Sequence, residues 1–457
     1  MPDPTLAEMP RDATLARRFW TYALPSILAM LVTGLYVVVD GIFVGHYVGS
    51  VGLAAINLAY PLVMVQIGLG AMLSMGAATR IAILQGAGKH GEAAQILAAA
   101  LWMLALLGLV LSCTGLYLLE PLLRALGAAG EAELYRQTHD YLQWMLGGSV
   151  LVCGQILASY LLRNDGRPRL ATTLLVLATL SNITLDYLFV GVLGHGLAGS
   201  AQATLISQSL MLGFTLAYFF SPYARLRLTT LRVVRLGWHL ADMARLGLSS
   251  LLMELNLALV LLLHNWQLLI YDADTGVAAY AVAGYTETVF TLLAHGLAVG
   301  IQPLLGQAIG AAQPRQAHAI LRYALTVVVG GGIAVWLIIQ LWADAIAGLF
   351  AASDPVLLAA GSHALRLHLL ALPFDGLVIL GSIALQAMAL TRPALLATLA
   401  KTVLLLPALY SLPLWWGLNG VWLAMPVVNL LVACWVGIVL WRQMQMLAGT
   451  EPALQTA

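Results

Sequence analysis

Acidic side chains occur inside long apolar stretches of this 457-residue sequence, where a carboxylate has little water to solvate it. Asp40 stands in the apolar run 36–45, and Thr204 stands in a later one. Asp186 follows Asn182 by one helical turn, so their side chains share a helix face. An ionisable residue at bilayer depth costs roughly 2.5 to 3.5 kcal/mol on insertion scales, which makes each such residue a candidate for function.

Two carboxylates with an amide and a hydroxyl nearby suit the binding of a small cation. Such a set could hold a sodium ion through its oxygen atoms, at Asp40, Asn182, Asp186 and Thr204. Two carboxylates that lie close together in little water also tend to share a proton, as a proton-coupled switch requires. The structural alternative is that Asp186 caps a helix end and Asp40 hydrogen-bonds to backbone.

The second half of the chain has its own acids in apolar stretches, namely Glu254, Glu287 and Asp375. Each could form a second cation or substrate site, by serving coupling or by attracting a cationic substrate. Each could instead be a structural partner of Lys401, the only lysine in the middle of an apolar stretch. Tyr36, Met64 and Gln66 are candidates for lining a substrate cavity, and we expect His295, His363 and His368 to be packing or rim residues.

The composition excludes a soluble enzyme, a disordered protein and a disulfide scaffold. Hydrophobic residues make up 61% of the chain and charged residues only 9%, whereas soluble domains carry about 25% charged residues. The net charge of +1 gives no sign of a nucleic-acid partner. We find neither a phosphate-binding GxxxxGK[ST] loop nor a nucleophile–base or metal-ligand spacing, so the sequence indicates no enzyme and no cofactor.

The recurring apolar stretches have the length that a helix needs to cross a bilayer, about 20 residues. We place twelve helices, near 19–45, 53–83, 93–119, 138–162, 169–193, 197–220, 243–270, 277–309, 316–343, 359–389, 394–415 and 419–444. Lysine and arginine concentrate in alternate loops, which hold Arg11, Arg17, Arg18, Lys89, Arg163, Arg167, Arg169, Arg225, Arg227, Arg232, Arg235, Arg315, Arg392 and Arg442. The positive-inside rule therefore predicts that both termini are cytoplasmic.

The two halves of the chain align on each other with an offset of 224 residues, which pairs Gly52 with Gly276 and Gly76 with Gly300. This predicts an all-α integral membrane protein of two six-helix lobes, related by a pseudo-two-fold axis along the membrane normal. Such transporters commonly bind substrate between their repeats. The expected parts are an N-terminal segment, a first lobe, a linker, a second lobe and a tail, at 1–18, 19–222, 223–241, 242–446 and 447–457.

Four short segments together resemble the multidrug and toxic compound extrusion (MATE) transporters, in the bacterial multidrug branch. The segments are Asp40-Gly-Ile-Phe-Val-Gly45, Leu162-Arg-Asn-Asp-Gly-Arg-Pro-Arg169, Asn182-Ile-Thr-Leu-Asp186 and Gly306-Gln-Ala-Ile-Gly310-Ala. The resemblance implies a first-lobe cation site at Asp40, Asn182, Asp186 and Thr204, with Pro25 as the point where the first helix bends. In another branch of the family a second-lobe sodium site uses acids near the positions of Glu254 and Asp375.

We therefore expect secondary active efflux of amphipathic organic cations by antiport with H⁺ or Na⁺ through alternating access. The protein would act as a monomer in the bacterial cytoplasmic membrane. Three alternatives stay open: a flippase for a lipid-linked precursor, a drug porter of the other six-plus-six fold, and a channel. The flippase would favour a strongly basic cavity, whereas the charges expected in mid-membrane are mostly acidic.

Overall fold

The computed structural model describes residues 11–127, 131–228, 231, 233–272, 275–351 and 354–449. All regular secondary structure in these residues is helical. Four parts of the sequence expectations lie outside the described residues: residues 1–10 of the N-terminal segment, residue 232 of the cytoplasmic loops, residues 229–230 of the linker and residues 450–457 of the tail.

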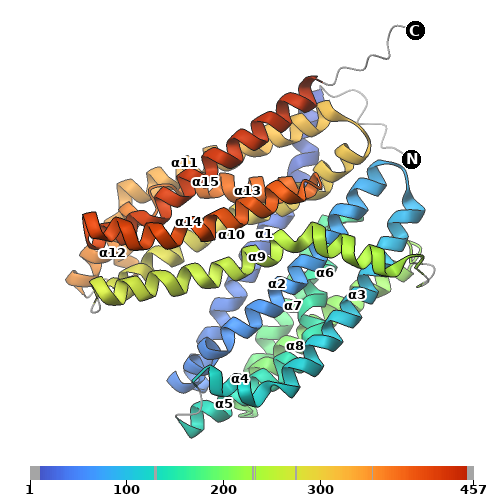
Figure 1. The fold of residues 1–457 in the computed structure, drawn as a ribbon. Helices are drawn as coiled ribbons and strands as arrows, with labels where there is room; N and C mark the ends of the chain where they lie inside the picture. The colour runs from blue at the N-terminus through green and yellow to red at the C-terminus, as the bar shows by residue number, and fades with distance from the viewer. Residues whose placement is uncertain are drawn as a thin grey trace, which may run out of the picture. The chain divides into compact units, whose positions relative to one another are not determined.

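The helices follow the apolar stretches of the sequence. They are α1 (Arg11–Tyr47), α2 (Ser50–Gly86), α3 (His90–Tyr117), α4 (Leu119–Ala125), α5 (Ala132–Gly147), α6 (Ser149–Asn164), α7 (Pro168–Asp186), a π-helix (Tyr187–Val192), α8 (Gly196–Phe220), α9 (Leu236–Tyr271), α10 (Gly276–Gly310), α11 (Pro314–Ala351), α12 (Pro355–His368), α13 (Leu372–Ala387), α14 (Thr391–Trp416) and α15 (Leu418–Gly449). Figure 1 shows them in chain order from blue to red.

Among the described residues, ten helices are each long and apolar enough to cross a membrane. Two further spans are bent pairs, α5 with α6 at 55° and α12 with α13 at 52°, and counting each pair as one span gives twelve. The spans expected at 138–162 and 359–389 are therefore present, and each is bent at a short break. The first bend falls at Gly147 and Gly148, and the second precedes Pro373 in the first turn of α13, where a proline lacks the N–H that would continue the preceding helix.

Irregularities of the backbone recur at the offset of the internal repeat. Gly148, at the first bend, lies 224 residues before Leu372, where α13 begins. Leu118, between α3 and α4, likewise lies 224 residues before Trp342, the non-helical residue within α11. Both halves thus interrupt their helices at corresponding points, which supports the repeat read from the glycine pairs.

The described residues form two compact units. Leu28–Leu255 make up the amino-terminal unit, and the residues up to Ile27 join those from Asn256 onward in the carboxy-terminal unit. The unit boundaries fall inside α1 and α9, so each of these two helices contributes to both units. The boundaries of the units reflect which residues pack together, whereas the boundaries of the lobes expected from the sequence reflect where the internal repeat begins again.

The same packing scheme holds within each unit, as the helices labelled in Figure 1 let the reader follow. In the amino-terminal unit α2 packs on α3, α5 and α6, and α8 packs on α5, α6 and α7. In the carboxy-terminal unit α10 packs on α11, α12 and α13, and α15 packs on α12, α13 and α14. Each helix in the second scheme is the repeat counterpart of one in the first.

Glycines let two pairs of helices approach backbone to backbone. A Cβ atom on Gly76 of α2 would lie 2.0 Å from the carbonyl oxygen of Met243 on α9, and one on Gly247 would lie 1.8 Å from that of Met72. In the carboxy-terminal unit, a Cβ atom on Gly300 of α10 would lie 2.8 Å from Cα of Ala23 on α1. Gly76 and Gly300 are repeat partners, so both units use a glycine at the same crossing.

Candidate functional site

Asp40 lies on α1, in the amino-terminal unit, and faces α8. The hydroxyl of Ser200 donates a hydrogen bond of 2.8 Å to Oδ1 of Asp40. Ser200 lies in the second turn of α8, which begins at Gly196 after a loop that contains Gly194 at a φ of 66°. The left-handed conformation of that loop suits glycine, which has no Cβ to clash. The loop therefore sets where α8 starts and brings Ser200 to the carboxylate.

Thr204 joins α1, α7 and α8 through its hydroxyl. Its Oγ1 lies 3.0 Å from the hydroxyl of Tyr36 and 3.4 Å from Nδ2 of Asn182, which donates to it. Thr204 is one turn after Ser200, so both side chains share a face of α8. The hydroxyls of α8 thus hold residues from both neighbouring helices at one place.

Asp186 is fully buried at the last residue of α7. Its carboxylate interacts with Asp40 and Asn182, but neither of its oxygens, nor Oδ1 of Asn182, has a hydrogen bond of good geometry with a described residue. A π-helix, Tyr187–Val192, follows directly. π-helical turns are frequent at functional sites, and here the wider turn lies next to the buried acid.

The charges of Asp40 and Asp186 lie close enough to interact, and the phenol of Tyr141 on α5 is within reach of both. Three buried oxygen atoms without a hydrogen-bond partner therefore stand beside a second carboxylate. Oxygen atoms of carboxylates, amides and hydroxyls are the ligands that hard cations prefer. The described residues contain no group of three or more His, Cys, Asp or Glu side chains that could hold a metal ion, and a set with only two carboxylates suits a monovalent cation or a proton.

The structure thus brings together all four residues that the sequence suggested for the first cation site, namely Asp40, Asn182, Asp186 and Thr204. It adds Ser200 and Tyr141, which the sequence interpretation missed. Ser200 could have been found, because it lies four residues before Thr204 on a helix. Nothing in the sequence singled out Tyr141, which stands on a different helix.

The three cavity candidates lie in different surroundings. Tyr36 is hydrogen-bonded to Thr204, one of the four candidate cation-site residues. Met64 is buried within α2, whereas Gln66 ties α2 to its neighbours, because its Nε2 donates to the carbonyl oxygen of Met145 at 3.0 Å and to Oγ of Ser149 at 2.6 Å. Pro25 lies inside α1, two residues before the boundary between the units.

The three acids suggested for a second site are divided between the two units. Glu254 belongs to the amino-terminal unit, where it interacts electrostatically with Tyr60. In the carboxy-terminal unit, Asp375 accepts a hydrogen bond of 2.8 Å from Nζ of Lys401, the structural partner that the sequence offered. Glu287 instead lies 3.4 Å from Nε2 of His368. Each of these carboxylates thus has a neighbouring side chain at hydrogen-bond distance, an ammonium for Asp375 and an imidazole for Glu287.

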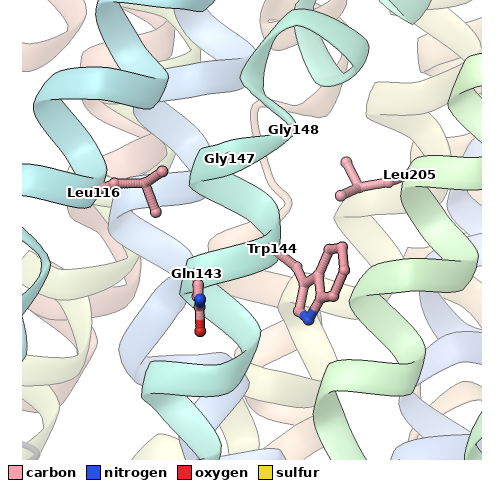
Figure 2. A pocket seen from close by; sticks show the side chains of 6 residues that line it. All are labelled: Leu116, Gln143, Trp144, Gly147, Gly148 and Leu205. Atoms are coloured by element: carbon pink, nitrogen blue, oxygen red, sulfur yellow. The ribbon is translucent and has the colours of Figure 1, made fainter.

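A pocket of about 390 Å³ lies at the bend between α5 and α6. Figure 2 shows Leu116 and Leu205 on opposite sides of the bend at Gly147 and Gly148. A Cβ atom on Gly148 would lie 2.2 Å from Cδ2 of Leu205, so the glycine is what lets α8 pack here. None of the cation-site residues lines this pocket.

Comparison with known proteins gives consistent results along the chain. The MatE family model matches residues 25–188 and 250–410. An FAD transporter of Shewanella oneidensis is 26% identical over 437 residues, which cover 93% of this chain and 94% of the relative. A multidrug export protein, MepA, of Staphylococcus saprophyticus is 22% identical over 400 residues, 88% of each chain.

Solved structures agree with the fold. A crystal structure of MATE in complex with MaL6 has a TM-score of 0.88 at 26% identity, and it covers 97% of this chain and 100% of its own. An outward-facing multidrug resistance MATE family transporter has a TM-score of 0.87 at 25% identity with the same coverage. Both resemblances extend over the two-lobe fold of twelve spans. The chain therefore belongs to the MATE family of multi-pass membrane transporters, whose members are not enzymes.

Proposed function

We propose that this protein exports amphipathic organic cations by antiport with H⁺ or Na⁺, through alternating access in the bacterial cytoplasmic membrane. Asp186 carries the proposal, because its buried carboxylate lies beside that of Asp40 and accepts no hydrogen bond of good geometry from the described residues. A buried carboxylate without a partner is costly, and a bound cation removes that cost. The multidrug export relatives support small molecules as the cargo.

In this proposal the coupling cation binds at Asp40 and Asp186, with further oxygens from Asn182 and Thr204. Binding neutralises the carboxylates, changes the packing of α1 near Tyr36 and lowers the affinity for the exported compound. Linkage then requires that the exported compound lowers the affinity for the coupling cation by the same factor. Because the two ligands oppose each other, inward flow of the cation can drive outward flow of the drug.

The basic loops that lie between alternate spans support an orientation with both termini in the cytoplasm. Of the residues in these loops, Arg167, Arg169 and Arg225 flank α7 and α8 at one end. Lysine and arginine accumulate on the cytoplasmic side, so these ends of the helices would face the cytoplasm. We also propose that the protein works as a monomer.

Export of a flavin dinucleotide is a second candidate function, favoured by the identity to the FAD transporter over nearly the whole of both chains. A buried arginine adds to it. Arg163 at the end of α6 is 1% exposed, and none of its guanidinium nitrogens has a hydrogen-bond partner among the described residues. An arginine of this kind suits a phosphate group, which it can bind in a bidentate manner.

Purified protein in liposomes distinguishes the two candidates. One set of liposomes holds the fluorescent cation ethidium and another holds FAD, and a proton gradient or a sodium gradient is imposed on each. We expect uphill movement of ethidium under one gradient, which also identifies the coupling ion. Uphill movement of FAD alone would replace the first proposal by the second, and movement of neither compound would direct attention to a flippase activity.

A further inference from the structure

A cluster of four buried rings lies in the carboxy-terminal unit, where the proposed function uses no residue. It consists of His264 on α9, Tyr280 on α10, His368 on α12 and Trp422 on α15, each at most 6% exposed. The ring of His264 stacks on that of Tyr280 at 5.1 Å. The ring of His368 stands perpendicular to these two rings, at 5.3 Å from His264 and 5.2 Å from Tyr280.

The contacts of the two imidazoles fix where their hydrogens lie. Nδ1 of His264 is 2.9 Å from the carbonyl oxygen of Val260, which only accepts, so this nitrogen carries the hydrogen. Nε2 of His368 is 3.4 Å from a carboxylate oxygen of Glu287 and donates to it in the same way. The remaining nitrogens, Nε2 of His264 and Nδ1 of His368, are buried and have no hydrogen-bond partner among the described residues. Each ring therefore offers one buried lone pair.

The charged groups around the cluster leave one negative charge without a counter-ion. Lys401 on α14 is within electrostatic reach of Glu287, but its ammonium is paired at 2.8 Å with Asp375 on α13. The other titratable groups next to His368 are His264 and Tyr280. Neither adds a charge, because His264 is a neutral imidazole and Tyr280 keeps its phenolic hydrogen. Glu287 on α10, whose side chain is 20% exposed, thus has no positive partner at hydrogen-bond distance while the imidazole of His368 is neutral. A partly buried carboxylate gains from a positive partner at this distance.

We propose that this cluster is a second proton-binding site, in which Nδ1 of His368 takes up a proton and the resulting imidazolium becomes the counter-ion of Glu287. The proton comes from water, and the only bond formed is N–H. The Tyr280 ring lies within the distance at which aromatic rings stabilise a cation. His264, which contacts no carboxylate at hydrogen-bond distance, stays neutral, since two imidazolium rings 5.3 Å apart would repel each other.

Protonation would strengthen the contact between α12 and α10, because the hydrogen bond that the neutral ring of His368 donates to Glu287 becomes an ion pair. The site shares no residue with the carboxylate pair of the amino-terminal unit. It can therefore exist whether or not the proposed antiport is correct, and it needs a test that does not depend on transport.

Tryptophan fluorescence supplies that test, because an imidazolium close to an indole quenches its emission, and Trp422 lies 6.3 Å from the ring of His368. Trp238 must first be replaced by Phe, since it lies 5.2 Å from the ring of His239 and would add its own titration. In this background we expect emission to fall when the pH is lowered and His368 takes up the proton.

The pH-dependent quenching should disappear in Trp422→Phe and in His368→Gln, since glutamine can still donate to Glu287 but binds no proton here. Glu287→Gln should weaken the quenching at a given pH, because the imidazolium loses its counter-ion. The matched control is His363→Gln on the same helix, an exposed histidine that contacts Asn419 at 2.7 Å. It should leave the titration unchanged.

Quenching that persists in His368→Gln, or that is absent from the Trp238→Phe background, would overturn the proposal. If His368→Gln fails to fold, Trp422→Phe and Glu287→Gln still decide, because each leaves the histidine in place. Asp40→Asn should retain the full pH-dependent quenching. The transport assay therefore tests the antiport proposal, and the fluorescence assay separately tests the proton site at His368.

Discussion

Ser200 on α8 donates a hydrogen bond of 2.8 Å to Asp40 on α1, across 160 residues of sequence. Hydrogen bonds to charged groups contribute roughly 1.5 to 3 kcal/mol. In the proposed mechanism this bond holds Asp40 in the position from which it shares a cation with Asp186.

We predict that Ser200→Ala lowers the rate of dye efflux about tenfold, the equivalent of about 1.4 kcal/mol. The measurement is ethidium efflux from cells with matched protein levels in the membrane. Ser200→Thr should restore most of the rate, because it keeps the hydroxyl. Ser207→Ala is the control on the same helix, since Ser207 bonds only to the carbonyl oxygen of Ala203 in its own helix. Equal rates in Ser200→Ala and Ser207→Ala would contradict the role of this bond.

The ion pair between Lys401 and Asp375 should be needed for stability. Their side chains are 16% and 3% exposed, so Lys401→Met leaves a buried carboxylate without a partner. Loss of one partner of a buried pair typically costs about 3 to 5 kcal/mol. We predict a clear fall in the thermal unfolding temperature in detergent for Lys401→Met, and recovery of most of it in the double variant with Asp375→Leu. A double variant no more stable than the single one would show that the two residues act independently.

The close approach of α2 and α9 should not tolerate a side chain at Gly247. A Cβ atom there would lie 1.8 Å from the carbonyl oxygen of Met72, so the two helices must move apart. Overpacking of this kind costs roughly 1 to 3 kcal/mol. We predict that Gly247→Ala lowers the unfolding temperature, whereas Gly237→Ala on the same helix, where a Cβ meets nothing within 4 Å, does not. Equal stabilities of the two variants would contradict this contact.

The turn after α10 contains a conformation that suits glycine better than the alanine it has. Ala312 has a φ of 51°, and its repeat partner Gly88 has a φ of 74° in the turn after α2. A left-handed conformation costs a residue with a Cβ roughly 1 to 2 kcal/mol. We predict that Ala312→Gly stabilises the protein by about 1 kcal/mol, after the larger entropy loss of glycine on folding is subtracted.

The same thermal unfolding assay measures this gain. Ala311→Gly provides the comparison, because Ala311 has a φ of −76° and gains nothing from glycine. A lower unfolding temperature for Ala312→Gly would show that this turn is not strained.

The spans could be predicted from the sequence because their apolar length is visible directly. The breaks could not, since the composition stays apolar through Gly147 and Gly148. Whether a glycine pair interrupts a helix depends on what packs against it, here Leu205 of α8. The residues next to Pro373 were more informative, because proline and glycine beside Asp375 indicate a local weakness of the helix.

The sequence predicted only part of the arrangement of the candidate cation site. Asn182 and Asp186 share a helix face by spacing alone, whereas their proximity to Asp40 depends on how α1 packs on α7 and α8. The proton site in the other unit could not be predicted at all. His264 and His368 are distant in sequence, and only the packing of α9 and α12 brings their rings to 5.3 Å.

The most direct test of the account is uphill ethidium movement in liposomes with Asp40→Asn protein, under the proton gradient and the sodium gradient separately. Asp344→Asn is the matched control, because this acid is 65% exposed and pairs with Arg366 outside the cation site. We predict that Asp40→Asn abolishes gradient-driven movement while the protein reconstitutes normally, and that Asp344→Asn moves dye like the wild type. Uphill movement that survives in Asp40→Asn under the coupling gradient would contradict the assignment of the cation site.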